Sequence, residues 1–104
     1  MLLSTTYTIH GRKIVKHLGL VRGNTIRARH IGRDIMAGLR NIVGGEITDY
    51  TKMMAESREQ AIDRMIEEAQ KLGANAIIGV RFSTTETMQR AAEIMTYGTA
   101  VVVE

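Results

Sequence analysis

Two segments near the C-terminal end of the chain, residues 76–86 and 93–103, are apolar at consecutive positions. Ile77 is followed by Ile78, and three valines stand together at positions 101–103. A strand with one face in water alternates apolar and polar residues, whereas these segments are apolar on both faces. We therefore predict two strands, joined by the polar turn "TETMQRA", in a sheet whose second face is also covered. Two covers remain open, a neighbouring subunit or a short helix of the same chain.

A long helix is predicted from Thr48 to Leu72. Apolar residues recur there at helical spacing on one stripe, and charged residues occupy the other positions. Gly73 stands just beyond the last turn, where a left-handed backbone conformation favours glycine. Thr48 or Asp49 is expected to cap the N-terminus, because their side-chain oxygens accept hydrogen bonds from free backbone N–H groups.

The segment "KIVKHLGLVRGNTIRARH" predicts a β-hairpin. Residues 14–21 are rich in β-branched and apolar side chains, the dipeptide "GN" at 23–24 suits a two-residue turn, and residues 25–30 form the returning strand. This register places His17 opposite His30 on one face of the sheet. With the two C-terminal strands, the sheet has about four strands.

These elements predict a single α+β domain over residues 1–104, with an antiparallel sheet packed against one long and one short helix. The short helix is expected over residues 31–43, where apolar residues recur at helical spacing and Gly44 and Gly45 supply its end. The chain has no proline and no low-complexity linker, so nothing divides it.

Composition excludes several classes of function. The chain has no cysteine, which removes disulfides, thiolate nucleophiles and thiolate metal sites together. No Walker loop, dinucleotide fingerprint or nucleophile elbow occurs, and no hydroxyl has an identifiable base, so we expect a protein that is not an enzyme. The apolar residues are too dispersed for a membrane span, and the N-terminus lacks the pattern of an export signal. A cytoplasmic protein without membrane contact is therefore expected.

The charge is distributed unevenly along the chain. Residues 1–40 carry a net charge of about +7 and residues 41–104 about −4. A basic half of this kind attracts nucleic acid or small anions, and it equally allows one subunit to dock head to tail on the next. The chain has three Tyr, one Phe and no Trp for stacking on bases, so docking or simple solvation is favoured over nucleic-acid binding.

Several motifs together resemble the YbjQ family, small bacterial and archaeal proteins to which heavy-metal binding has been attributed. The similarity runs over nearly the whole chain, and its most specific part is "RDIMAGLRNIVGG". It is carried also by "STT" at 4–6, "GLVRG" at 19–23, "LGANAIIGV" at 72–80 and "GTAVVV" at 98–103. The resemblance implies a dodecin-like subunit that assembles into a homo-oligomeric ring of five copies. It implies no established reaction.

The turn "GLRNIVGGE" is the candidate site for a ligand or a subunit contact. Its two glycines let backbone N–H groups approach an anion at the positive end of the long helix, although a pair of glycines between two helices is more often a simple corner. In a structural interpretation, Arg33 and Asp34 form an ion pair between subunits and Tyr50 anchors the long helix. The resemblance directs attention to six positions in this region: Arg33, Asp34, Arg40, Gly44, Gly45 and Tyr50.

A metal site would have to use histidine. If His17 and His30 face each other across a hairpin, their Cβ atoms lie about 5 Å apart, and both imidazoles can bind one divalent ion. No carboxylate within the hairpin orients either ring, and a third ligand must come from elsewhere. The sequence therefore leaves three functions open: a homo-oligomeric structural or small-ligand-binding protein, a metal-binding module, and a weak binder of nucleic acid or anions.

Overall fold

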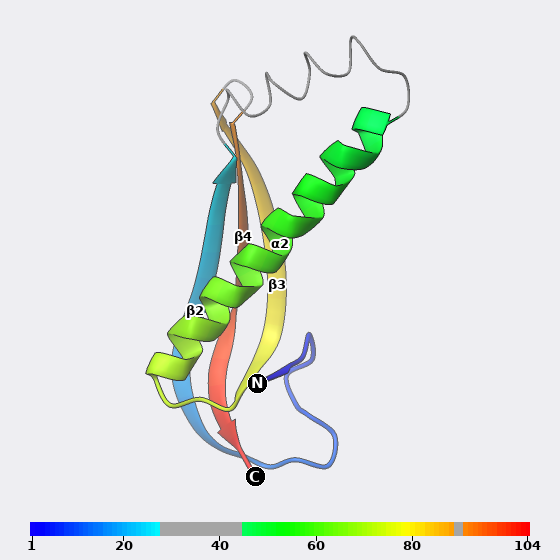
Figure 1. Cartoon of the computed structure of the whole chain (residues 1–104). Coiled ribbons are helices and arrows are strands. Elements are labelled where there is room, and N and C mark those ends of the chain that lie inside the picture. The colour runs from blue at the N-terminus through cyan, green and yellow to red at the C-terminus, as the bar shows by residue number, and fades with distance from the viewer. Residues whose placement is uncertain (28–44, 89–90) are drawn as a thin grey trace.

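A computed structural model describes residues 1–27, 45–88 and 91–104 of the chain. The elements are β1 (Leu2–Leu3), β2 (Ile14–Arg27), α2 (Gly45–Lys71), β3 (Ala76–Met88) and β4 (Ala91–Val103) (Figure 1). Within this part of the chain the sheet has the strand order β1-β3-β4-β2. The predicted α+β class is confirmed, but the sheet is mixed, because β1 pairs parallel to β3 while the other pairs are antiparallel.

The predicted hairpin at residues 14–30 is wrong. β2 runs through Gly23 and Asn24 without a turn and pairs with β4 along its length, so that Val21 lies opposite Gly98 and Ile26 opposite Glu93. The reason is that Gly23 lies under the helix and not in a turn. A Cβ atom there would lie 2.0 Å from the backbone oxygen of Ala61. The glycine allows close approach of two backbones, which a sequence pattern does not distinguish from a turn.

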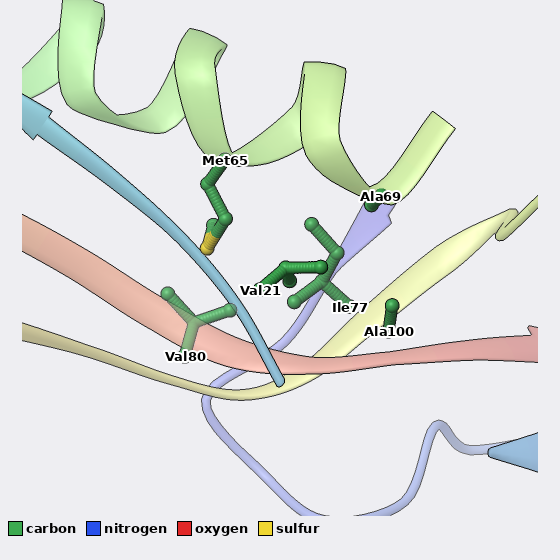
Figure 2. Close-up of a cluster of buried hydrophobic side chains, with 6 residues drawn as sticks. All are labelled: Val21, Met65, Ala69, Ile77, Val80 and Ala100. Carbon is green, nitrogen blue, oxygen red and sulfur yellow. The ribbon is translucent and has the colours of Figure 1, made fainter. Parts of the chain in front are cut away.

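α2 crosses one face of the sheet and buries the apolar core between them (Figure 1). Met65 and Ala69 of the helix are fully buried, and they pack on apolar residues of β2, β3 and β4 (Figure 2). The predicted helical stripe is thus confirmed at Ala61, Met65 and Ala69, whereas Leu72, predicted as its last member, is 47% exposed just beyond α2. The sheet contributes to this cluster Val21, Ile77, Val80 and Ala100.

The ends of the long helix differ in how well they were predicted. At the C-terminus Gly73 adopts φ 85° as expected, and the N–H of Ala74 donates to the carbonyl of Ala69 while the N–H of Gly73 donates to Gln70, both at 3.0 Å. These two bonds form a Schellman cap. At the N-terminus α2 begins at Gly45, so Thr48 and Asp49 lie inside the helix and are not its cap. The short helix predicted over residues 31–43 lies outside the described residues.

The N-terminal segment of the chain covers part of the second face of the sheet, which is the face opposite α2. The N–H of Ser4 donates to the carbonyl of Ile77 at 2.9 Å, and the N–H of Gly79 donates to that of Thr6 at 2.9 Å, which ties this segment to the edge of β3. Ile9 then packs on a second buried cluster on that face. The predicted second cover is thus supplied in part by the chain's own N-terminal segment. The cluster consists of Ala76, Ile78, Val101 and Val103.

The Asn75 side chain joins the start of β3 to the end of β4. Its Nδ2 donates to the carbonyl of Val103 at 2.8 Å, and its Oδ1 accepts from the N–H of Val103 at 2.8 Å. We expect Asn75→Ala to lower the free energy of unfolding by about 1 to 2 kcal/mol, because two hydrogen bonds are lost. Urea unfolding measures this. The control Gln70→Ala, at an exposed position of α2, should change stability by less than about 0.5 kcal/mol, and an equal loss in both variants would contradict this role.

Candidate functional site on the open face and free edge of the sheet

On the face of the sheet opposite α2, the N-terminal segment contacts Arg81 of β3, and no described residue of another element covers the side formed by β2. Val21, Gly23 and Thr25 of β2 are buried on the helix side, so the alternate residues of that strand point to the other side. There Leu20 is 68% exposed and Ile26 is 63% exposed. We call this surface the open face; it comprises Leu20, Arg22, Asn24 and Ile26 of β2, Glu93, Met95, Tyr97 and Thr99 of β4, and Arg81 and Ser83 of β3.

The strand register brings two arginines to the same tyrosine on the open face. Tyr97 of β4 lies directly opposite Arg22 of β2, and on its other side it lies opposite Arg81 of β3. Directly opposite residues have Cβ atoms about 4.5 to 5.5 Å apart, so these three side chains form one continuous row across the sheet. We call it the Arg-Tyr-Arg row. The neighbouring row is Asn24, Met95 and Ser83.

Two cavities lie beside β2, and Leu20 and Arg22 line both of them. One, of about 370 Å³, lies on the open face against Ser83, Met95 and Tyr97. The other, of about 540 Å³, lies toward α2 and is also lined by Val21, Asn24 and Glu68. Both are hollows that open widely to solvent, so a small molecule in either would keep part of its surface in water.

The outer edge of β2 is unpaired in the described part of the sheet. The carbonyl of Asn24 points away from β4 and accepts a hydrogen bond from the guanidinium of Arg64, so at this one point the edge is bonded to α2. Backbone groups of alternate residues point to the same side of a strand, so those of Leu20 and Arg22 also point outward. A free edge of this kind is a template for another strand.

The second arginine of the row, Arg81, is held by the N-terminal segment. Its Nη1 donates to the carbonyls of Thr5 and Val80, each at 2.8 Å, and its guanidinium carbon lies 5.7 Å from the centre of the Tyr7 ring. The "STT" hydroxyls serve the same segment, because the Oγ of Ser4 accepts from the N–H of Thr6 at 3.1 Å. We interpret these residues as structural. Their bonds hold the segment that packs on β3.

The site residues predicted from the sequence are placed only in part. Gly45 is the first residue of α2 and Tyr50 lies in its second turn. The remaining predicted ligand or subunit-contact positions, Arg33, Asp34, Arg40 and Gly44, lie outside the described residues.

The hairpin on which the predicted metal site at His17 and His30 depended does not form. His17 is exposed on β2 opposite Val101, and His30 lies outside the described residues. Because the hairpin does not form, its register no longer brings the two histidines together. Within residues 1–27, 45–88 and 91–104, no group of three or more His, Asp or Glu side chains is arranged to hold a metal ion.

Sequence reasoning missed the Arg-Tyr-Arg row. The row depends on the pairing of β4 with both of its neighbours, and the hairpin register had assigned β2 a different partner. The available signal was the alternation in the segments "VRGN" and "YGT", in which the polar or aromatic Arg22, Asn24, Tyr97 and Thr99 alternate with the small or apolar Val21, Gly23 and Gly98.

No helix within the described part of the chain combines the length and the apolar character needed to cross a bilayer.

Comparison with known proteins decides the family. A sequence model of the YbjQ family, described as "Putative heavy-metal-binding", matches residues 1–104. The chain belongs to the YbjQ family. A UPF0145 protein of Dehalococcoides mccartyi is 64% identical over 104 residues and is covered, like this chain, over its full length. A UPF0145 protein of Methanosarcina acetivorans is 57% identical over 101 residues, which cover 97% of this chain and 95% of that protein. The resemblance drawn from the motifs is thus confirmed.

A solved structure supports the fold of this YbjQ family chain. It is a protein of unknown function from Pediococcus pentosaceus that belongs to the DUF74 family. The TM-score is 0.65 at 18% sequence identity, over 100% of this chain and 98% of that one. At this identity the likeness shows the fold alone.

Proposed function

We propose that this YbjQ family chain is the subunit of a homo-oligomer that closes into a ring and offers sites for small ligands. The observation that carries the proposal is the exposure of Leu20 and Ile26, at 68% and 63%, on a strand whose outer edge pairs with no other strand among the described residues. Exposed apolar side chains beside a free strand edge are typical of a surface that docks on another chain.

The shape and the charge of the subunit support the same proposal. The radius of gyration is 17.0 Å, whereas a compact domain of 104 residues has about 13 Å. The net charges of about +7 on residues 1–40 and −4 on residues 41–104 favour contact between unlike surfaces of neighbouring copies. Such head-to-tail contacts form rings when the rotation between subunits closes. Five copies is the number that the family resemblance implies.

The double variant Leu20→Asp, Ile26→Asp tests the surface that this proposal uses. We expect light scattering to find a particle near the 11.5 kDa of one chain, because two buried carboxylates in an apolar contact cost more than the contact contributes. Leu72→Asp, at a 47% exposed leucine of the helix end, is the matched control and should leave the mass of the assembly unchanged. Unchanged far-UV circular dichroism establishes that both variants are folded. A double variant that keeps the mass of the parent protein would refute the proposed surface.

A further inference from the structure

The open face carries a feature that assembly does not require. In the Arg-Tyr-Arg row, Tyr97 is partly buried between Arg22 and Arg81. Beside the row lies the cavity of about 370 Å³. Its lining residues and their charge limit the class of small molecule that can bind there.

The walls of the cavity suit a flat or apolar group. Leu20 and Met95 supply apolar surface, and Tyr97 also lines the cavity, at the β4 position opposite Arg22. Methionine adapts its shape to different partners, and a tyrosine ring offers a face for stacking together with a hydroxyl for hydrogen bonding. The hydroxyl of Ser83 adds a second polar group. An apolar wall with a few polar groups is the usual composition of a small-molecule site.

The charge of the cavity selects an anion. Among the described residues, the Arg22 guanidinium has neither an ion-pair partner nor a hydrogen-bond acceptor. The Glu68 carboxylate, which lines the cavity on the helix side, lies 3.5 Å from Lys71. Glu93 of the open face stands two residues from Met95 at one end of the cavity, about 7 Å along β4, and four residues from Tyr97, which lies opposite Arg22, about 13 Å. The distance at the Arg22 end exceeds the screening length of about 10 Å at 0.1 M salt, so the anionic group is placed at that end.

We propose that this cavity binds a small organic anion, a carboxylate or phosphate carried on an aromatic or short aliphatic body. Arg22 binds the anionic group as a planar pair of N–H donors, Tyr97 and Met95 contact the body, and Arg81 adds positive potential from the far side of the row. The described lining residues belong to one subunit, and the proposal deepens the proposed function by naming the class of ligand; it shares Leu20 with the proposed subunit contact. A neighbour on the edge of β2 would add a wall to the cavity.

The test uses 2-naphthoate as the probe and neutral 2-naphthamide as its isostere, each titrated into the protein labelled with ¹⁵N. We expect the naphthoate to bind with a dissociation constant on the order of 1 mM, as befits a ligand of this size, and to shift the amide signals of Leu20, Arg22, Met95 and Tyr97. The naphthamide should bind about tenfold more weakly, since it lacks the charge that Arg22 recognises. 1-Naphthyl phosphate shows whether a phosphate is preferred to a carboxylate. Equal binding of naphthoate and naphthamide would overturn the proposal.

Two variants localise the site. Arg22→Gln should weaken naphthoate about tenfold, whereas Lys52→Gln, which removes the same charge from an exposed position of α2, should change the affinity by less than about twofold. Tyr97→Phe keeps the ring and should weaken binding only through the lost hydroxyl. Equal effects of Arg22→Gln and Lys52→Gln would reduce the site to general charge attraction and refute it. If Arg22→Gln instead dissociates the assembly, Arg22 is a subunit contact and the proposal also fails.

Discussion

Gly23→Ala is expected to destabilise the protein by about 3 kcal/mol or more, the largest effect we predict for adding a single methyl group. The new Cβ atom would lie 2.0 Å from the carbonyl oxygen of Ala61 and 2.5 Å from the backbone nitrogen of Met65. Both are main-chain atoms of α2, so they cannot rotate away as a side chain would. The helix would have to lift from β2, and the packing of Met65 would be lost with it.

Urea unfolding of Gly23→Ala at a fixed concentration of protomer measures this effect, because the stability of an oligomer depends on concentration. Gly73→Ala is the matched control. At Gly73 the new Cβ would meet no atom within 4 Å, and only the positive φ of +85° opposes it, which costs about 1 kcal/mol. If both variants lost the same stability, backbone conformation and not helix contact would explain the glycine at position 23.

Met65→Ala is expected to lower the free energy of unfolding by about 3 kcal/mol. Met65 is fully buried in the core under α2 (Figure 2). Its sulfur accepts a hydrogen bond from the Oγ1 of Thr96 at 3.8 Å. Removing the side chain leaves a cavity between helix and sheet that backbone segments on both sides keep from collapsing.

The same unfolding experiment applies to Met65→Ala, with Glu67→Ala as its control. Glu67 is exposed two residues further along α2, and its truncation should change stability by less than about 0.5 kcal/mol. A loss below about 1 kcal/mol in Met65→Ala would mean that the helix is not held on the sheet by this core.

The elements that the sequence predicted well are those specified by local pattern. The stripe of α2 follows from helical periodicity, and its C-terminal cap follows from Gly73, whose conformation depends on the adjacent turn alone. β3 and β4 were predicted to within a few residues, because their apolar runs are long and the polar turn between them is short. The doubly apolar strands also indicated that the second face of the sheet is covered. They did not indicate that the N-terminal segment supplies part of that cover.

The features that the sequence did not predict depend on contacts between distant residues. The sequence around Gly23 is typical of a turn, and only its contact with α2 shows why a glycine stands there. The wrongly predicted turn also paired His17 with His30, whereas His17 pairs with Val101. Gly79, with φ 62°, lies at a shift of register in the pairing of β3 with β4, and a Cβ there would meet the Tyr7 ring at 3.0 Å. No periodicity relates positions 7 and 79.

The candidate site shows the same limit. The turn "GLRNIVGGE" was predicted as a site because its glycines and Arg40 are neighbours in the sequence. The Arg-Tyr-Arg row draws its three residues from three strands, and only the register of β4 with β2 and β3 brings them together. Sites of this kind become visible when the pairing of the strands is known.

The mass of the purified protein in solution tests the central claim most directly. Light scattering coupled to size exclusion, at a micromolar concentration of protomer, should give a multiple of 11.5 kDa, five copies being the number that the family resemblance implies. A single species near 11.5 kDa at that concentration would contradict the account, because no partner chain would then cover the exposed Leu20 and Ile26 or the edge of β2 that is unpaired among the described residues.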